Sequence, residues 1–306
     1  MKALFRLNRG ATDGCFDDPV LLAPILAGLV ALAGPPAAPA LPAGWAPVST
    51  GPDGGVVYQG RIPDRFVPAD HRVSAVYLPP GYTAARRYPV VYLLHGMSGT
   101  PASIWNGMRL ADVADSLIAS GGTPPFIAVM PVAGPTVDPN AGEWAGVWEQ
   151  FVVDGVVPWV DAHVAAEPGP QGRALEGLCA GGFGAVDIGL RHPGVFGTLG
   201  SFEGYFAPVF RDGPFVHATP QVLRAHDPTL LVRSEAASLR HAGVRFYVSV
   251  GGNHGGVMRS WTLAFAKELS GLGLDHELWL LPKADRGHFW RATLPSALAY
   301  GVLSKT

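Results

Sequence analysis

One stretch decides the fold: Glu176-Gly177-Leu178-Cys179-Ala180-Gly181-Gly182, between an expected strand at Arg173-Ala174-Leu175 and an expected helix from Phe183 to Arg191. Its frame, Gly-x-Cys-x-Gly, is typical of a nucleophile elbow, with cysteine where serine normally stands. Glycine at Gly177 and Gly181 leaves room for the backbone that doubles back past them. Cys179 would then lie at a helix N-terminus, where unpaired N–H groups favour a thiolate. The alternative is a buried cysteine in a glycine-rich turn.

The composition is that of an ordinary globular protein and excludes some classes of partner. The chain has 306 residues, a formal net charge of −2, 48% hydrophobic residues and 15% charged residues. A nearly neutral chain gives no reason to expect a nucleic-acid partner, because nucleic-acid binding leaves a basic footprint. It contains no His-x-x-x-His or Cys-x-x-Cys pair, and we therefore expect neither a metal nor a cofactor.

The N-terminus has the order of an export signal. Lys2, Arg6 and Arg9 precede a largely apolar run from Val20 to Gly34, and small residues and prolines follow. This order is typical of a secretory signal peptide, although an uncleaved anchor is the alternative. We therefore expect residues 1–43 to be a signal peptide or N-terminal anchor and residues 44–306 to be the folded domain, in a secreted or cell-envelope protein. If Cys15 leaves with the signal, Cys179 has no internal disulfide partner.

Apolar runs bounded by turn residues alternate with helical patterns. Amphipathic periodicity predicts helices over Trp148 to Val164, where Pro158 introduces a kink, and from Val257 to Gly271. The excursion from Phe206 to Thr229 has four prolines and little periodicity, and is expected at the surface as one wall of a pocket. Strands that alternate with helices predict a mostly parallel central sheet with helices on both faces. The expected strands are Val56–Ile62, Arg72–Leu78, Val90–Leu94, Phe126–Met130, Gly197–Phe202, Arg245–Val250 and Glu277–Leu281. The apolar runs Val90–Leu94 and Phe126–Met130 suit strands buried on both faces of a parallel sheet.

A nucleophile in an elbow needs a base and a group that orients the base, and both follow it along the chain. His288 is the expected base, in a loop between the last strand and a helix from Phe289. The loop Gly251–Gly256 should supply the acid but contains no carboxylate; Asn253 could accept the imidazole N–H, as in Cys-His-Asn sites. Asp285 is the other candidate, and His254 could instead line the pocket wall.

Acyl transfer also needs donors for an oxyanion. The N–H of Ala180 is one, and the loop after His95-Gly96 should supply the second from Met97 or Ser98. His95 and Gly96 themselves are expected to shape that turn. Several charged or aromatic residues after strands could line a pocket for the acyl group or its acceptor, although structural roles are more common for such residues: Glu143, Trp144, Trp148, Glu149 and Glu203.

Five motifs in the same order resemble the Putative esterase family, which includes esterase D, enterochelin esterase and the antigen 85 mycolyltransferases. They are Tyr77–Tyr82, Arg87–Gly96, Val129–Pro131, Gly177–Gly182 and Gly287–Trp290, within a likeness that runs from Val56 to Leu303. The resemblance implies the α/β-hydrolase fold, with Ser-His-Asp/Glu catalysis on esters or acyl transfer between carbohydrate acceptors. The chain departs from that pattern at Cys179 and at Asn253 or His254. Dienelactone hydrolases resemble this fold and have a cysteine nucleophile.

These observations lead to two hypotheses. The first is an exported esterase or acyltransferase that cleaves or transfers an acyl group through a Cys179 thioester, with a small-molecule or cell-envelope ester as substrate and an association with membrane or cell wall left open. The second is a catalytically inactive relative that keeps the pocket to bind a glycan or lipid.

Overall fold

The predicted strand–turn–helix unit forms the centre of the molecule. Strand β6 (Arg173–Leu178) leads into helix α5 (Ala180–Arg191), and Cys179 is the single residue between them. The computed structural model describes residues 41–65, 67, 73–133, 143–210, 213–251, 256–281 and 286–303, with only the backbone for residues 286–288. All of these belong to one unit, Ala37–Thr306. The expected signal segment therefore lies almost entirely outside the described residues.

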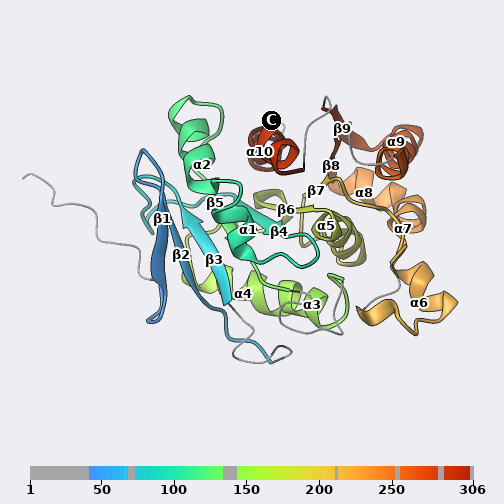
Figure 1. The fold of residues 1–306 in the computed structure, drawn as a ribbon, viewed down its shortest axis with the longest axis horizontal. Helices are drawn as coiled ribbons and strands as arrows, with labels where there is room; N and C mark the ends of the chain where they lie inside the picture. The colour runs from blue at the N-terminus through green and yellow to red at the C-terminus, as the bar shows by residue number, and fades with distance from the viewer. Residues whose placement is uncertain are drawn as a thin grey trace, which may run out of the picture. The chain divides into compact units, whose positions relative to one another are not determined.

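Within the described residues, nine strands form one sheet in the order β1-β2-β3-β5-β4-β6-β7-β8-β9 (Figure 1). The first three strands are antiparallel, β3 is antiparallel to β5, and all pairs from β5 to β9 are parallel. The predicted mostly parallel sheet is confirmed. Its other strands are β1 (Ala46–Thr50), β2 (Val56–Arg61), β3 (Val73–Leu78), β4 (Val90–Leu94), β5 (Ile127–Met130), β7 (Thr198–Phe202), β8 (Arg245–Val250) and β9 (Asp275–Leu280).

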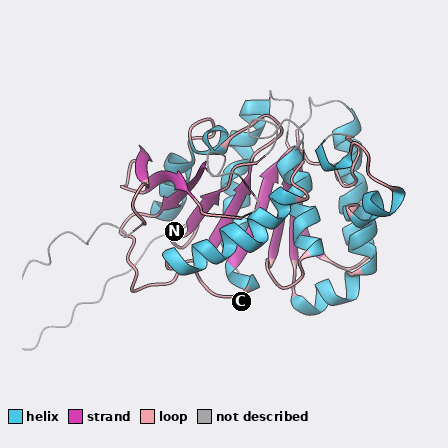
Figure 2. Ribbon diagram, turned by 90° about the horizontal axis from the view of Figure 1, so that it is seen from below, coloured by secondary structure: helices cyan, strands magenta, loops and turns pink. Residues whose placement is uncertain are grey.

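Helices cover both faces of the sheet, as two separate apolar cores show. One core joins the sheet to α1 (Pro101–Trp105), α2 (Leu110–Ala119) and α10 (Arg286–Val302). The other joins it to α4 (Val157–His163), α5 and α9 (Gly256–Gly271). In Figure 1, α2 and α10 lie above the sheet, and α4 lies below it with α3 (Val147–Gln150). Figure 2 shows the strands enclosed between helices.

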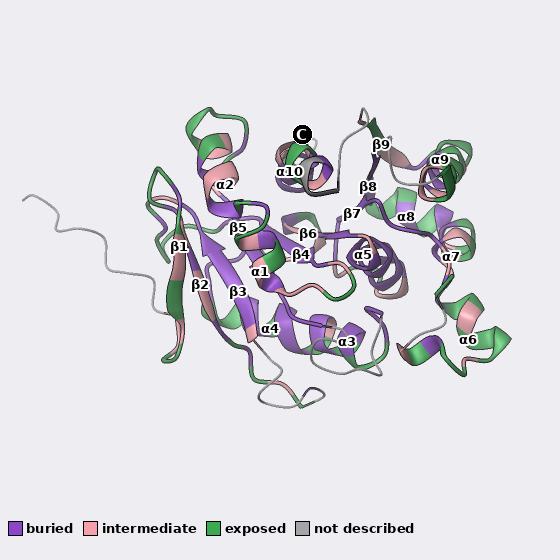
Figure 3. Ribbon diagram, viewed as in Figure 1, coloured by how far each residue is buried: buried purple, intermediate pink, exposed green. Residues whose placement is uncertain are grey.

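Burial follows the position of each strand in the sheet. The strands from β4 to β8 are buried along nearly their whole length, as is α5 (Figure 3). Strand β9 is the edge strand, and its last four residues, three of them apolar, are exposed. An apolar run alone does not reveal whether a strand has a neighbour on one side or on two.

Two helical regions differ from expectation. The helix expected from Trp148 to Val164 runs from α3 through a π-helical turn, η2 (Phe151–Val156), into α4, which has Pro158 at its second residue. A π turn adjusts the hydrogen-bond ladder just where proline removes a donor, so the helix continues. Helix α10 begins at Arg286 rather than Phe289, which places His288 in its first turn instead of in a loop.

The expected surface excursion contains a short 3₁₀ turn, η4 (Gly213–Phe215), and helix α6 (Pro220–Ala225); α7 (Pro228–Ser234) and α8 (Ala236–Ala242) follow it. Across the described part of the chain, no helix combines the length and apolar character needed to cross a membrane.

Candidate active site

The backbone of Cys179 has the shape of a nucleophile elbow. Its φ is 53° and its ψ is −112°, a conformation that costs a non-glycine residue about 1–3 kcal/mol and that is concentrated at functional sites. The two flanking glycines are required sterically. A Cβ on Gly177 would lie 2.2 Å from the carbonyl oxygen of Gly181, and a Cβ on Gly181 would lie 2.2 Å from that of Leu94. The turn can therefore be this tight only with glycine at both places.

Hydrogen bonds hold Cys179 at the carboxyl edge of the parallel strands. Its N–H donates to the carbonyl of Phe202 at the end of β7, at 2.9 Å, and its own carbonyl accepts from the N–H of Phe183 in α5, at 3.0 Å. Cys179 is partly exposed. Cys179 is therefore not a cysteine buried within the core, which was the alternative interpretation. Cys179 is the N-cap residue of α5 and so adjoins the unpaired N–H groups of a helix start.

The loop after β4 lies directly against the elbow. A Cβ on Gly96 would be 3.4 Å from the Cβ of Cys179, so Met97 follows a residue in contact distance of the nucleophile. The loop is a tight turn in which the N–H of Gly99 donates to the carbonyl of Gly96, at 2.9 Å, and Ser98 has a φ of 61°. Ala180, the first residue of α5, is buried on the other side of Cys179. Ala180 and Gly96, the residue before Met97, therefore both adjoin Cys179, and the oxyanion roles of Ala180, Met97 and Ser98 stay predictions.

His95 is a structural residue. Its Nε2 accepts the N–H of Ala133 at 3.1 Å, so its Nδ1 carries the proton and donates to the carbonyl of Gly96 at 2.8 Å. Burial lowers the pKa of His95 to about 4, against the opposing effect of the Gly96 carbonyl. The Nε1–H of Trp144 donates to the carbonyl of His95 at 2.9 Å. His95 is thus neutral and fixes the turn that carries Met97.

The expected base and acid are described only in part. His288 lies in the first turn of α10, directly before Phe289, whose buried side chain packs near the carboxyl edge of the sheet. Asn253, His254 and Asp285 lie outside the described residues. Their roles stay predictions.

Of the charged residues expected near a pocket, Glu143 and Glu203 are buried close to the elbow. The hydroxyl of Tyr205 donates a hydrogen bond to the carboxylate of Glu143, and the ring of Tyr205 stacks on Phe183, with ring centres 5.0 Å apart. Glu203 is 2% exposed and has a φ of 53°. Tyr205 was not among the expected site residues, although its place two residues after Glu203, just beyond a buried strand, was an available signal.

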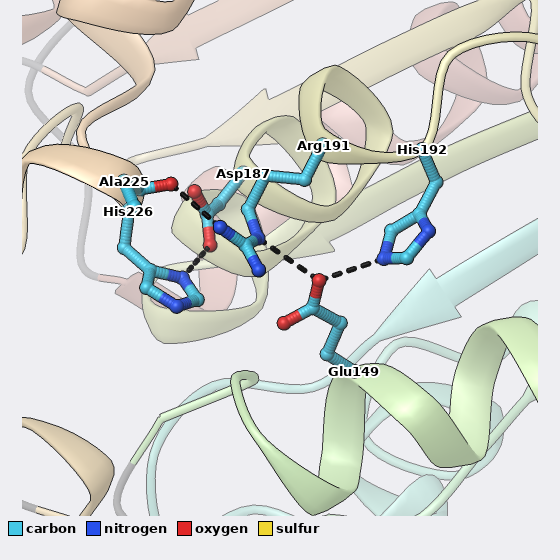
Figure 4. Close-up of polar contacts among 6 residues, drawn as sticks. All are labelled: Glu149, Asp187, Arg191, His192, Ala225 and His226. Carbon is cyan, nitrogen blue, oxygen red and sulfur yellow. Dashed lines mark hydrogen bonds and ion pairs between the residues drawn. The ribbon is translucent and has the colours of Figure 1, made fainter. Parts of the chain in front are cut away.

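Glu149 belongs to a structural network at the far end of α5 (Figure 4). Its carboxylate accepts from Arg191 Nε at 2.9 Å and from His192 Nε2 at 2.7 Å. Burial acts to raise the pKa of Glu149, but these hydrogen bonds hold it below its usual value. Beside this network, His226 Nδ1 lies 2.7 Å from the buried carboxylate of Asp187. Glu149 therefore ties the α3 region to α5 and does not line the elbow.

The same network fastens the excursion at 206–229 to the central helix. Arg191 Nη1 donates to the carbonyl of Ala225 at 2.7 Å, next to the contact between His226 and Asp187 (Figure 4). A hollow of about 170 Å³ adjoins the excursion, as expected for a pocket wall, and an ion pair of Arg233 and Glu268 lies at it. Its lining also includes Phe206, Ala207, Val209, Thr229, Trp261, Ala264 and Phe265. In the residues with described placement, no cluster of three potential metal ligands occurs.

Two known proteins similar to part of this chain carry the name esterase. A xylanase/feruloyl esterase of Xylanibacter ruminicola is 35% identical over 142 residues, which are 44% of this chain and 19% of that protein. An esterase of Mycobacterium tuberculosis is 32% identical over 139 residues, 42% of this chain and 28% of that protein. The chain thus spans less than a third of the length of either relative.

A solved structure shows the same fold at low sequence identity. The fluorophosphonate-binding serine hydrolase F of Staphylococcus aureus aligns with a TM-score of 0.66 and 15% identity, over 82% of this chain and 99% of that one. That protein is a serine hydrolase, whereas this chain has Cys179 at the elbow. The likeness shows the α/β-hydrolase fold.

A family model matches the larger part of the chain. The model described as Putative esterase matches residues 69–271, a range that contains the elbow and ends before His288. Together with the sheet order and the conformation of Cys179, this match places the chain in the Putative esterase family.

Proposed function

We propose that this chain is an exported carboxylic-ester hydrolase or acyltransferase that acts through a thioester on Cys179. One observation carries the proposal: Cys179 holds a strained backbone conformation, φ 53° and ψ −112°, that only an elbow with glycines at 177 and 181 permits. A turn of this kind presents a side chain above the sheet, beside a helix N-terminus.

The chemistry needs a base, a nucleophile and two oxyanion donors. In the proposed first step, the imidazole of His288 takes the thiol proton and the Cys179 sulfur attacks the ester carbonyl carbon. The N–H groups of Ala180 and of Met97 or Ser98 stabilise the negative charge on the carbonyl oxygen. The alcohol then leaves with the proton from His288, and a thioester remains on Cys179.

In the second step, His288 takes a proton from water or from an acceptor hydroxyl, which attacks the thioester. A carboxylic acid or a new ester is released, and the proton returns to the Cys179 sulfur. Water and a hydroxyl acceptor use the same groups, so the geometry of the elbow fits hydrolysis and transfer equally.

The test is an acyl adduct on Cys179. The purified protein is exposed briefly to p-nitrophenyl acetate and to a feruloyl ester, since one relative is named a feruloyl esterase, then quenched in acid and analysed by peptide mass spectrometry. We expect one acyl group on the peptide that contains Cys179, and none in Cys179→Ala or His288→Ala. A folded wild-type protein that turns over neither ester and acquires no adduct would refute the proposal and favour the inactive glycan- or lipid-binding relative.

A further inference from the structure

The two edges of the sheet differ in how they would meet another strand. Strand β1, at one edge, contains Pro47, and its register with β2 shifts between Pro47 and Ser49. Proline and an irregular register are devices that stop an edge strand from pairing with another chain. Strand β9, at the other edge, pairs with β8 in unbroken register, and the sequence from Asp275 to Leu281 contains no proline, lysine or arginine. The devices that protect β1 are therefore missing from β9.

The backbone of β9 has hydrogen-bonding groups on its outer side. The N–H of Leu281 donates to the carbonyl of Val250 in β8, at 3.1 Å. Successive residues of a strand direct their backbone groups to opposite sides, so those of His276, Leu278 and Leu280 are directed away from β8. Among the described residues, no strand pairs with β9 on that side. Such an edge is a template for a further strand.

The side chains at the end of β9 are large, apolar and exposed (Figure 3). Leu278, Trp279 and Leu280 are 37%, 43% and 45% exposed. The ring of Trp279 stacks on Tyr247 of β8, with ring centres 6.4 Å apart, and so lies on the face of the sheet opposite to Leu278 and Leu280. Both faces of this edge therefore present apolar surface to a strand that would pair with it.

Helix α9 extends the apolar surface on one face. Ser270 Oγ lies 3.1 Å from His276 Nε2, which places His276 on the α9 side of β9. Leu278 and Leu280 share that face, because side chains alternate along a strand. Leu263 precedes Ser270 by about two helical turns, lies on the same side of α9, and is 37% exposed. The apolar surface thus continues from the strand to the helix beside it.

The strand is complementary to a second copy of itself. In an antiparallel pair with a two-fold axis at Leu278, this residue meets its own copy, and His276 meets the partner subunit's Leu280; these pairs exchange two hydrogen bonds each. Glu277 meets the partner subunit's Trp279, so the two Glu277 carboxylates do not face one another. An axis at Glu277 would set them opposite, and like charges directly opposite destabilise a sheet. An axis at Trp279 would leave fewer hydrogen-bonded pairs.

From these features we propose that β9 is the interface for a second copy of this chain. The two β9 strands pair antiparallel across a two-fold axis at Leu278 and join the two sheets into one. Stable interfaces bury about 1,200 Å² or more, so the contact includes the flank of α9 around Leu263 as well as the strand. A two-fold interface uses the same surface on both subunits, as this strand permits. The inference is independent of the proposed chemistry at Cys179.

The first experiment measures the mass of the full chain in solution. Sedimentation velocity at about 1 to 100 µM should show a species with twice the mass of the chain. Leu278→Lys and Leu278→Glu each set two like charges opposite one another at the axis, so each variant alone should raise the dissociation constant by about tenfold or more. A mixture of the two variants sets opposite charges together and should dimerise again. Leu230→Lys in α7 is the matched control, because Leu230 is 40% exposed and lies away from β9, and it should dimerise like wild type.

The second experiment tests the register. Hydrogen-bonded residues directly opposite each other have Cα atoms about 5.5 Å apart, which a disulfide can bridge. Leu278→Cys should therefore give a disulfide-linked dimer on a non-reducing gel after mild oxidation. Glu277→Cys is the control: the two copies of residue 277 are offset along the strands beyond the about 7 Å that a disulfide can bridge, so no such dimer should form. This control also reports any link through Cys15 or Cys179.

Three results overturn the inference. They are a wild-type protein that stays monomeric over the whole concentration range, a dimer that folded Leu278→Lys and Leu278→Glu leave as stable as in wild type, and equal cross-linking of Leu278→Cys and Glu277→Cys. Circular dichroism melting curves establish that each charge variant is folded. If either is not, the comparison of Leu278→Cys with Glu277→Cys decides the question.

Discussion

The pH dependence of stability tests whether the buried side chain of Glu176 is protonated in the folded protein. It lies on β6, three residues before the nucleophile, and is fully buried. Neither carboxylate oxygen has a hydrogen-bond partner among the described residues. Burial raises the pKa of Glu176 well above its usual value, against the opposing effect of Arg245. Burial therefore favours the protonated form of this side chain in the folded protein.

Because the pKa of Glu176 differs between the folded and unfolded states, the stability of the protein depends on pH. The pKa is higher in the folded state, so the stabilisation by Glu176 is fully present below the pKa of the unfolded chain and is lost as pH rises toward the folded pKa. Between these two values one group changes the free energy of unfolding by about 1.4 kcal/mol per pH unit. Glu176→Gln mimics the protonated acid and cannot ionise. We therefore expect the free energy of unfolding of the variant, relative to that of wild type, to increase by about 1.4 kcal/mol per pH unit.

The assay is urea unfolding of wild type and Glu176→Gln at pH 5, 6, 7 and 8, followed by tryptophan fluorescence. The difference in free energy of unfolding should increase with pH in favour of the variant, by about 3 kcal/mol over two pH units. Parallel curves for wild type and Glu176→Gln would refute the reasoning, because they would mean that Glu176 is ionised in the core.

Two further predictions concern packing at α5. Gly181→Ala would bring a Cβ within 2.2 Å of a backbone carbonyl of β4. We therefore expect the free energy of unfolding in urea to fall by about 3 kcal/mol, and mass spectrometry to find no Cys179 adduct. Gly271→Ala is the control and should be neutral, because the space around Gly271 is open. His226→Ala removes the partner of the buried Asp187 carboxylate and should cost about 3 kcal/mol in thermal unfolding; exposed His217→Ala is its control, and equal melting temperatures for the two would contradict the role given to this pair.

The sequence alone determined the local chemistry of the chain. The alternation of apolar runs with helical periodicity was enough for a mostly parallel sheet, because strands buried on both faces and helices packed on them leave different patterns. The frame Gly-x-Cys-x-Gly was enough for the elbow, because only glycine tolerates the close backbone contacts at Gly177 and Gly181. Strands β4 and β8 have the predicted bounds.

Tertiary structure decided which residues come together. No local pattern shows that β9 is an edge, since an edge is defined by the absence of a neighbour and not by the strand's own residues. The parallel register sets Glu203 beside Cys179, 24 positions apart in the sequence, and the close approach of Phe289 to Gly251 brings in the start of α10. Proximity of this kind depends on the order of strands in the sheet, whereas spacing along the chain records only sequence order.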